Sequence, residues 1–177
     1  MNKKAFYLFL ALALPGLIFV FLKFFGKNEF DVPVYYKDGL PKDSVCHASG
    51  VGPYVVPDSV FLKMGATKVG STRIVAVYPF IQDDLSELNR IATKYQAERV
   101  ETLVVSGMPN LPKSKLPVTQ LGYSTFGWLV SCGLRVHEPW SVVLIDEKNQ
   151  IRGYYDGNRR DEMDRLDLEL SIVLKKY

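Results

Sequence analysis

The sequence predicts an α/β fold that follows one N-terminal transmembrane helix. Three observations lead to this prediction: a long apolar run near the N-terminus, short apolar runs that alternate with amphipathic segments further along the chain, and two β-rich runs joined by a short polar turn. Short continuous apolar runs are typical of strands that are buried on both faces, and helical periodicity is typical of helices that cover a sheet. The pattern therefore predicts one sheet with helices packed against it.

Residues 1–27 form the predicted membrane anchor. Every residue in the run 5–22 is apolar apart from Tyr7, Pro15 and Gly16, which approaches the roughly 20 residues that a bilayer-spanning helix needs. A cleaved signal peptide would have a shorter apolar core that ends at a small-x-small site. A slight excess of positive charge before the run favours an inside N-terminus. We therefore expect a single-pass protein of the inner (cytoplasmic) membrane whose C-terminal domain faces the periplasm or an equivalent outer space.

The rest of the chain divides into an extension and a domain. Residues 28–72 are rich in Pro, Gly and short polar residues, so they predict an irregular linker or N-terminal extension and not a helix. The predicted domain, residues 73–177, begins with the apolar run 74–78, which is typical of a buried strand. A helix should follow, because apolar residues then recur at helical spacing, and Asp84 with Glu87 can form a capping box at its start.

The remaining patterns complete the order of the domain. They predict, in turn, a strand at 100–105, a loop containing Pro and Lys at 106–119, a helix at 124–131, a hairpin with strands at 141–145 and 151–155, and a final amphipathic helix that Asn158 caps. The order β-α-β-α-β-β-α is the layout of a thioredoxin-like domain, with helices on both faces of the sheet.

Charge and cysteine content restrict the possible functions. The 22 basic and 19 acidic side chains give a net charge of +3 and are spread along the chain. No basic block interleaved with aromatic residues is present, so we expect no nucleic-acid partner. The two cysteines, Cys46 and Cys132, form no CxxC or zinc-type spacing. They fit either a structural disulfide in an oxidising compartment or two unrelated buried thiols.

The end of the chain resembles a known family. Residues 142–146 (VVLID), residues 151–157 (IRGYYDG) and the terminal amphipathic helix are similar to the C-terminal third of Sco/SenC proteins. The resemblance implies a membrane-anchored, thioredoxin-like protein that takes part in cytochrome c oxidase assembly. It also implies that the partner is cytochrome c oxidase or a larger respiratory complex containing it.

The chain departs from this family at the reactive site. The family's chemistry rests on a CxxxC motif at the end of the first buried strand and a histidine before the hairpin, because two thiolates and an imidazole suit copper. Here the strand ends in residues 78–84 (YPFIQDD), which contain no cysteine. We therefore expect a degenerate member without thiol-disulfide exchange, without enzymatic activity and without a cofactor.

Two arrangements of the candidate site residues compete. In the first, Cys46 and Cys132 form a disulfide that joins the N-terminal extension to the sheet. In the second, Cys46, His47, Cys132 and His137 form a relocated copper site, and the chain is a copper metallochaperone. A weaker third possibility is a thiol oxidoreductase that uses Cys132 alone. The resemblance also makes Pro139 a candidate cis-proline, because it lies just before the third predicted buried strand, where thioredoxin folds commonly carry one.

The sequence thus predicts a membrane-anchored domain that binds another protein. Its expected role is that of an accessory, assembly or structural protein of a respiratory complex that contains cytochrome oxidase. Copper enters only in the alternative, as the cargo of a metallochaperone.

Overall fold

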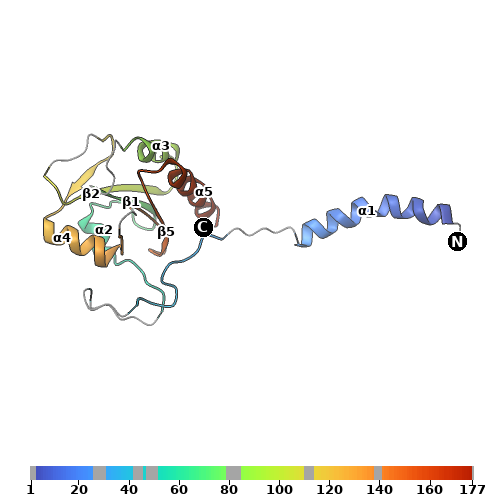
Figure 1. The fold of residues 1–177 in the computed structure, drawn as a ribbon, viewed down its shortest axis with the longest axis horizontal. Coiled ribbons are helices and arrows are strands. Elements are labelled where there is room, and N and C mark those ends of the chain that lie inside the picture. The colour runs from blue at the N-terminus through green and yellow to red at the C-terminus, as the bar shows by residue number, and fades with distance from the viewer. Residues whose placement is uncertain are drawn as a thin grey trace. The chain divides into compact units, whose positions relative to one another are not determined.

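The computed structural model describes residues 3–25, 31–41, 46, 52–78, 85–109, 114–137 and 141–176. In chain order, the elements are α1 (Lys3–Phe25), α2 (Asp58–Lys63), β1 (Thr72–Tyr78), α3 (Ser86–Lys94), β2 (Val100–Ser106), β3 (Val118–Gln120), α4 (Tyr123–Trp128), the π-helix η1 (Leu129–Gly133), β4 (Val142–Ile145), β5 (Ile151–Tyr155) and α5 (Arg160–Lys176) (Figure 1). Contacts divide the chain into two units, Met1–Asp31 and Val32–Tyr177.

The sheet has five strands in the order β3-β2-β1-β4-β5. Strands β1, β2 and β3 are parallel, whereas β4 is antiparallel to both β1 and β5. From β1 onward, the chain follows the predicted β-α-β-α-β-β-α order, with β3 added at one edge of the sheet. The predicted α/β class and thioredoxin-like order are therefore confirmed.

Each face of the sheet has its own apolar core. Along β1, Ile74 and Ala76 lie in one core and Val75 and Val77 in the other, because successive side chains of a strand point to opposite faces. The first core is closed by α3 and α5, the second by α2 and η1. Burying one large aliphatic side chain stabilises a fold by about 1.5–3 kcal/mol. Apolar packing stabilises both faces of the sheet in this way. The outer surfaces of the helices that cover the two faces can therefore differ in charge.

Part of the predicted irregular extension is helical. Within the range 28–72, α2 forms six residues of helix that place Val60 and Phe61 in the second core. A helix this short has little stability alone and depends on tertiary packing. The composition rich in Pro and Gly therefore indicated the loops around α2 correctly but hid the helix. The compact unit that contains the sheet begins at Val32, and Val32 itself is buried in the core of that unit.

The N-terminal unit contains α1, which covers the apolar run 5–22. Among the residues that the structure describes, no helix combines the length and apolarity needed to cross a membrane. The predicted transmembrane helix is therefore not confirmed.

Three local features differ from the predictions. β3 lies partly inside the predicted loop 106–119, and the predicted helix 124–131 is divided between α4 and η1. α3 has Leu85 at its N-cap, without a capping hydrogen bond from a side chain. The predicted capping residue, Asp84, lies outside the described residues.

Candidate functional site

The predicted disulfide between Cys46 and Cys132 is present. Their Cα atoms lie 5.4 Å apart, although the two residues are 86 positions apart in the sequence. Cys132 belongs to η1 and is 8% exposed. The bridge therefore joins the extension before β1 to the π-helix that precedes β4, as the first of the two sequence-based arrangements required.

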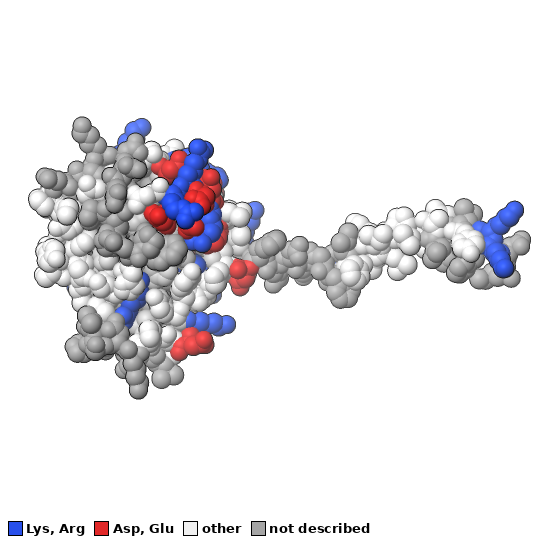
Figure 2. All heavy atoms as spheres, viewed as in Figure 1, with Lys and Arg blue, Asp and Glu red and all other residues white. Residues whose placement is uncertain are grey.

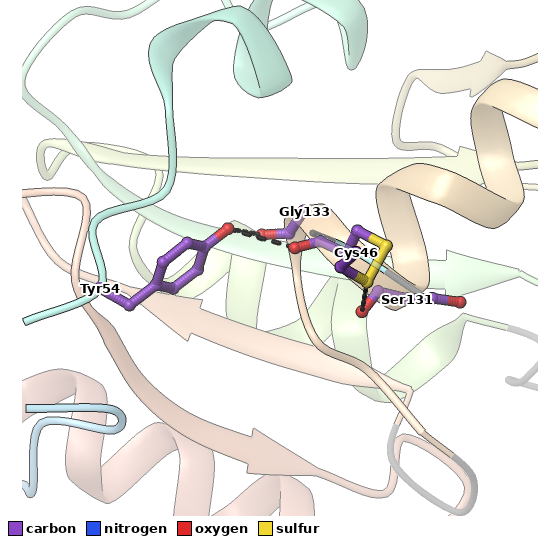
Figure 3. Close-up of a disulfide and its surroundings, with 5 residues drawn as sticks. Cys46, Tyr54, Ser131 and Gly133 are labelled. Carbon is purple, nitrogen blue, oxygen red and sulfur yellow. Dashed lines mark hydrogen bonds between the residues drawn. A yellow bond between two sulfur atoms is a disulfide. The ribbon is translucent and has the colours of Figure 1, made fainter. Parts of the chain in front are cut away.

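A tyrosine strengthens the same connection. The Tyr54 hydroxyl donates to the carbonyl oxygen of Gly133 at 2.7 Å and lies 3.3 Å from that of Cys132, and the Cys46 Sγ lies 3.9 Å from the Ser131 carbonyl oxygen (Figure 3). Carbonyls at the end of a helix lack partners within the helix, so a side-chain donor satisfies them. Burial raises the pKa of Tyr54, Arg135 lowers it and Tyr36 raises it, with a net increase. The hydroxyl therefore stays protonated and able to donate.

The π-helix has hydrogen bonds of longer span than an α-helix. The Leu134 amide donates to the Leu129 carbonyl oxygen at 2.8 Å, and the Val136 amide donates to the Val130 carbonyl oxygen at 2.9 Å. Short π-helical segments are rare and occur frequently at functional sites. In this protein the π-helix carries Cys132, which forms the disulfide with Cys46. The same π-helix carries Val130 and Ser131, which line a pocket.

The other predicted site residues do not assemble with the cysteines in the described part of the chain. His137 is exposed, whereas His47 and Pro139 lie outside the described residues. Within those residues, no group of three His, Cys, Asp or Glu side chains could hold a metal ion. Both cysteines of the sequence are bridged. In this oxidised state neither offers the thiolate that the copper site or a thiol oxidoreductase would use.

A pocket lies at the carboxyl end of β2. Its volume is about 320 Å³. It is lined by Gly107 and Met108, which follow β2, by Tyr123, Phe126 and Gly127 of α4, and by Val130 and Ser131 of η1. In open α/β sheets, ligands bind outside the carboxyl ends of the parallel strands. The position of the pocket therefore matches the usual binding edge of such a sheet.

Burial separates the floor of the pocket from its mouth. Val130 is 4% exposed and forms part of the floor, whereas Tyr123 is 87% and Met108 48% exposed at the mouth. At Gly107, an added Cβ atom would come within 2.6 Å of the Phe126 ring. The backbone of Gly107 therefore forms the wall against which this ring packs.

The segment that supplies most of the described lining of the pocket contains no charged residue. Residues 116–134, which include β3, α4 and η1, contain no Asp, Glu, Lys or Arg, although 23% of the whole chain is charged. Figure 2 shows charged side chains gathered over α3 and α5, away from α4. Trp128 is 46% exposed, and the Lys63 ammonium of α2 lies 5.0 Å from the centre of its ring. This uncharged face, defined as residues 116–134 with Met108, suits an apolar partner.

The disulfide could be predicted from the sequence, whereas the pocket could not. Its lining comes from three separate segments, and their proximity follows only from the fold. The signal that the sequence did contain was the uncharged stretch 116–134, which is unusual for a surface loop and helix. Such a stretch marks an interaction surface when its large apolar residues are exposed.

The geometry defines an α/β domain of thioredoxin-like order with an uncharged pocket and a structural disulfide. No protein-family model matches the chain, and no curated protein matches its sequence. Among solved structures, one similar chain is BsSco, a member of the Sco family of cytochrome c oxidase assembly proteins in which a disulfide switch was identified. The match has 12% sequence identity and a TM-score of 0.44, and covers 61% of this chain and 82% of that chain.

Proposed function

We propose that this chain is an accessory protein of a respiratory complex containing cytochrome oxidase, and that it acts by binding another protein. The observation that carries the proposal is the uncharged face, where an open pocket lies beside exposed aromatic side chains. Interface cores are depleted in charge and enriched in Tyr, Trp, Phe and Met. The choice of partner rests on the resemblance of residues 142–157 to Sco/SenC proteins.

The proposal assigns no redox or copper chemistry to the chain. Thiol-disulfide exchange requires a thiolate, and tight copper binding requires soft donors that converge. The sequence has two cysteines, and the structure joins them to each other. The exposed His137 then lacks a sulfur ligand. The role is that of an assembly or structural protein, with copper delivery by Cys46, His47, Cys132 and His137 as the competing function.

The proposed location is the outer side of the cytoplasmic membrane. This part rests on the sequence alone, where the apolar run 5–22 is preceded and followed by lysines. A single N-terminal anchor would hold the domain in the periplasm or an equivalent outer space, which is also an oxidising compartment in which a disulfide persists. The domain would then meet its partner at the membrane surface.

The proposal is tested by purifying the tagged full-length chain from native membranes in mild detergent. We expect the chain to resist extraction by salt and, once solubilised, to carry cytochrome oxidase with it, seen as the oxidase spectrum in the eluate. The same preparation should hold no stoichiometric Cu(I) in the presence of a strong chelator. An eluate without the oxidase would contradict the proposed partner. One copper per chain that survives the chelator and is lost in His137→Ala would instead establish the metallochaperone.

A further inference from the structure

We propose that the pocket at the end of β2 binds an uncharged aromatic side chain, of Trp or Phe size, presented by a partner polypeptide. This inference rests on the proposed function and deepens it, because it names the chemistry by which the partner is recognised. Four properties of the site support it: the volume of the pocket, the lack of charge in its described lining, the glycine at its mouth and the exposed residues around it.

The volume of the pocket suits a large ring. An engineered apolar cavity of about 150 Å³ holds one benzene molecule, and this pocket has a volume of about 320 Å³. It therefore has room for a two-ring indole, or for a phenyl ring with part of its backbone. An alanine or valine side chain would leave most of the space unfilled, and unfilled apolar space loses dispersion contacts.

The lining restricts the occupant to an uncharged group. Among the residues that the structure describes, none of those lining the pocket is charged, and the sequence has no charged residue in the stretch 116–134. Moving an ionised group from water into such a site costs several kcal/mol unless it is paired. In the described lining, the polar atoms are the hydroxyls of Ser131 and Tyr123 and the backbone groups. These can accept an indole N–H but cannot neutralise an ammonium or a carboxylate.

Gly127 gives the pocket its open mouth. It lies inside α4, where glycine costs about 0.5–1 kcal/mol relative to alanine. A Cβ atom at this position would meet nothing within 4 Å, so packing does not require glycine. The residue also lines the pocket. A position that breaks a local preference without a structural reason is expected at functional sites.

The surroundings indicate a polypeptide partner. Tyr123, Met108 and Trp128 expose apolar area at and beyond the mouth of the pocket, which one small molecule would leave in water. Protein interfaces typically have a buried aromatic anchor surrounded by contacts that exclude water. A flat bilayer surface would cover these residues but leave the concave floor at Val130 unfilled.

The experiment uses full-length protein, labelled with ¹⁵N in detergent, and the peptide acetyl-Gly-Ser-Trp-Ser-Gly-amide as probe. We expect saturable shifts of the Gly107, Gly127 and Ser131 amides, and no such shifts with Lys in place of Trp in the peptide. Gly127→Phe adds a ring at the pocket, where the backbone has space for it, and should weaken binding about tenfold or more, equivalent to 1.4 kcal/mol. The matched control is Leu168→Phe.

Leu168 is a suitable control because its side chain is 63% exposed, it belongs to α5 on the other face of the sheet, and it is not among the residues that line the pocket. Its variant should bind within about twofold of the parent, a difference of less than 0.5 kcal/mol. Equal binding by Gly127→Phe, or equal shifts with the Lys peptide, would overturn the inference. Two other outcomes would also overturn it, in each case if the peptide leaves the amides unshifted. The first is binding of the chain to lipid vesicles that Gly127→Phe abolishes. The second is self-association of the chain that Gly127→Phe abolishes.

The outcomes separate this inference from the proposed function. If Gly127→Phe loses the peptide but the parent chain never copurifies with cytochrome oxidase, the pocket chemistry stands and the partner is wrong. If the parent copurifies with the oxidase and Gly127→Phe does so equally well, the accessory role stands and the pocket is not the point of contact.

Discussion

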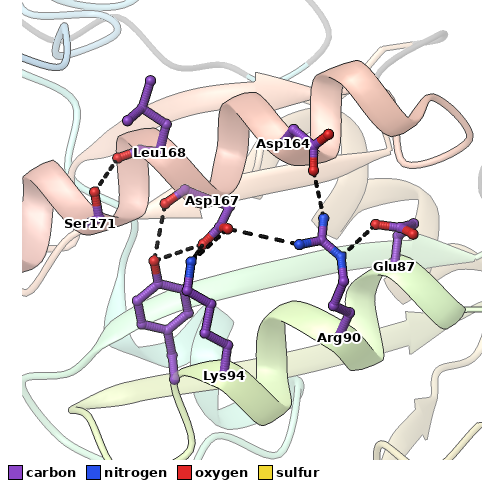
Figure 4. A network of polar contacts seen from close by, with 8 residues as sticks. Glu87, Arg90, Lys94, Asp164, Asp167, Leu168 and Ser171 are labelled. Carbon is purple, nitrogen blue, oxygen red and sulfur yellow. Dashed lines mark hydrogen bonds and ion pairs between the residues drawn. The ribbon is translucent and has the colours of Figure 1, made fainter.

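The α3–α5 face of the sheet and the uncharged face formed by α4 and η1 differ in the polar contacts that they make. On the α3–α5 face, Arg90 contacts three carboxylates, those of Glu87 at 2.7 Å, Asp164 at 2.8 Å and Asp167 at 3.8 Å (Figure 4). The Lys94 ammonium adds a contact of 2.7 Å to Asp167. The other face of the sheet also has a buried ion pair, between Arg73 and Glu101 at 3.4 Å. The uncharged face itself, residues 116–134 with Met108, is instead held by a disulfide, by a tyrosine hydroxyl on helix-end carbonyls and by a lysine over Trp128.

This difference supports the proposal that a partner protein contacts the uncharged face. The charges of α3 and α5 neutralise each other within the domain, and exposed ion pairs of this kind contribute about 0–1 kcal/mol each. The uncharged face instead leaves an apolar pocket and large aromatic side chains in contact with water. In the proposed role, a partner protein would bury that area. Perturbations of the two faces should therefore differ in size and in kind.

The largest effect on stability should come from the disulfide that holds the uncharged face. In the chain-entropy model, a bridge across 86 positions stabilises the fold by about 4–5 kcal/mol. Cys132→Ser should lower the free energy of unfolding by about that amount, measured by urea titration of the full-length protein followed by circular dichroism. Cys46→Ser, which breaks the same bond from the other side, is the matched variant.

The reduced parent protein provides the internal control for this prediction. It should unfold at the same urea concentration as Cys46→Ser, because both lack the same constraint. Cys132→Ser can be slightly less stable still, since Cys132 is buried and a hydroxyl replaces its sulfur. Identical unfolding of the oxidised and reduced parent would show that the bridge does not hold this face in place.

An effect of intermediate size should follow from Asp167 on the charged face. Its carboxylate is 17% exposed and accepts 2.7 Å hydrogen bonds from Lys94 and from the Tyr95 hydroxyl. Asp167→Ala should cost about 1 kcal/mol at pH 7, since both donors lose a partner. Asp164→Ala is the matched control on the next turn of α5. Its carboxylate is 58% exposed, so its removal should change little.

The contribution of Asp167 should also depend on pH. Burial raises its pKa, but the hydrogen bonds from Lys94 and Tyr95, together with the positive charges of Lys94 and Arg90, lower it by more, so the folded-state pKa lies below the ordinary value of 3.8. A carboxylate with a lowered pKa stabilises the folded state above its unfolded pKa, and this stabilisation is lost as the pH falls through the folded pKa. The difference between parent and Asp167→Ala should therefore narrow below pH 3.8. A difference that stays constant down to pH 2 would refute the ionic origin.

The core of the fold could be predicted from sequence because its signals are local and strong. The run 74–78 became β1, and the stripe of Met163, Leu166 and Leu170 became the buried side of α5. Apolar periodicity reports directly which side chains face a core. The same signal could not reveal β3, which has three residues and is held by pairing with β2, or α2, which is held by packing.

Of the candidate site, only the disulfide could be predicted, because it depends on two residues of one type. Two cysteines allow one pairing, so Cys46 and Cys132 were easy to propose as a bridge. The pocket depends on how Gly107, Phe126 and Val130 come together after folding, and no short motif encodes that. The π-helix is equally hidden, because its local sequence also predicts an ordinary helix. Tertiary contacts by Tyr54 and the disulfide accompany the wider turn.

The smallest expected effect concerns Gly127. The prediction is that glycine at this position keeps the pocket open and lowers the free energy of unfolding relative to alanine. Gly127→Ala places a methyl group where nothing lies within 4 Å and removes a glycine from the interior of α4. Alanine is favoured over glycine inside a helix by about 0.5–1 kcal/mol, so this variant should unfold at a higher urea concentration than the parent. Gly122→Ala is the contrasting variant, because Gly122 is the N-cap of α4, where alanine is less favoured than glycine. It should give no gain or a slight loss. Equal or lower stability of Gly127→Ala would mean that the backbone at Gly127 needs glycine for structural reasons, and the open mouth would then be a consequence of the fold and not a feature maintained for binding.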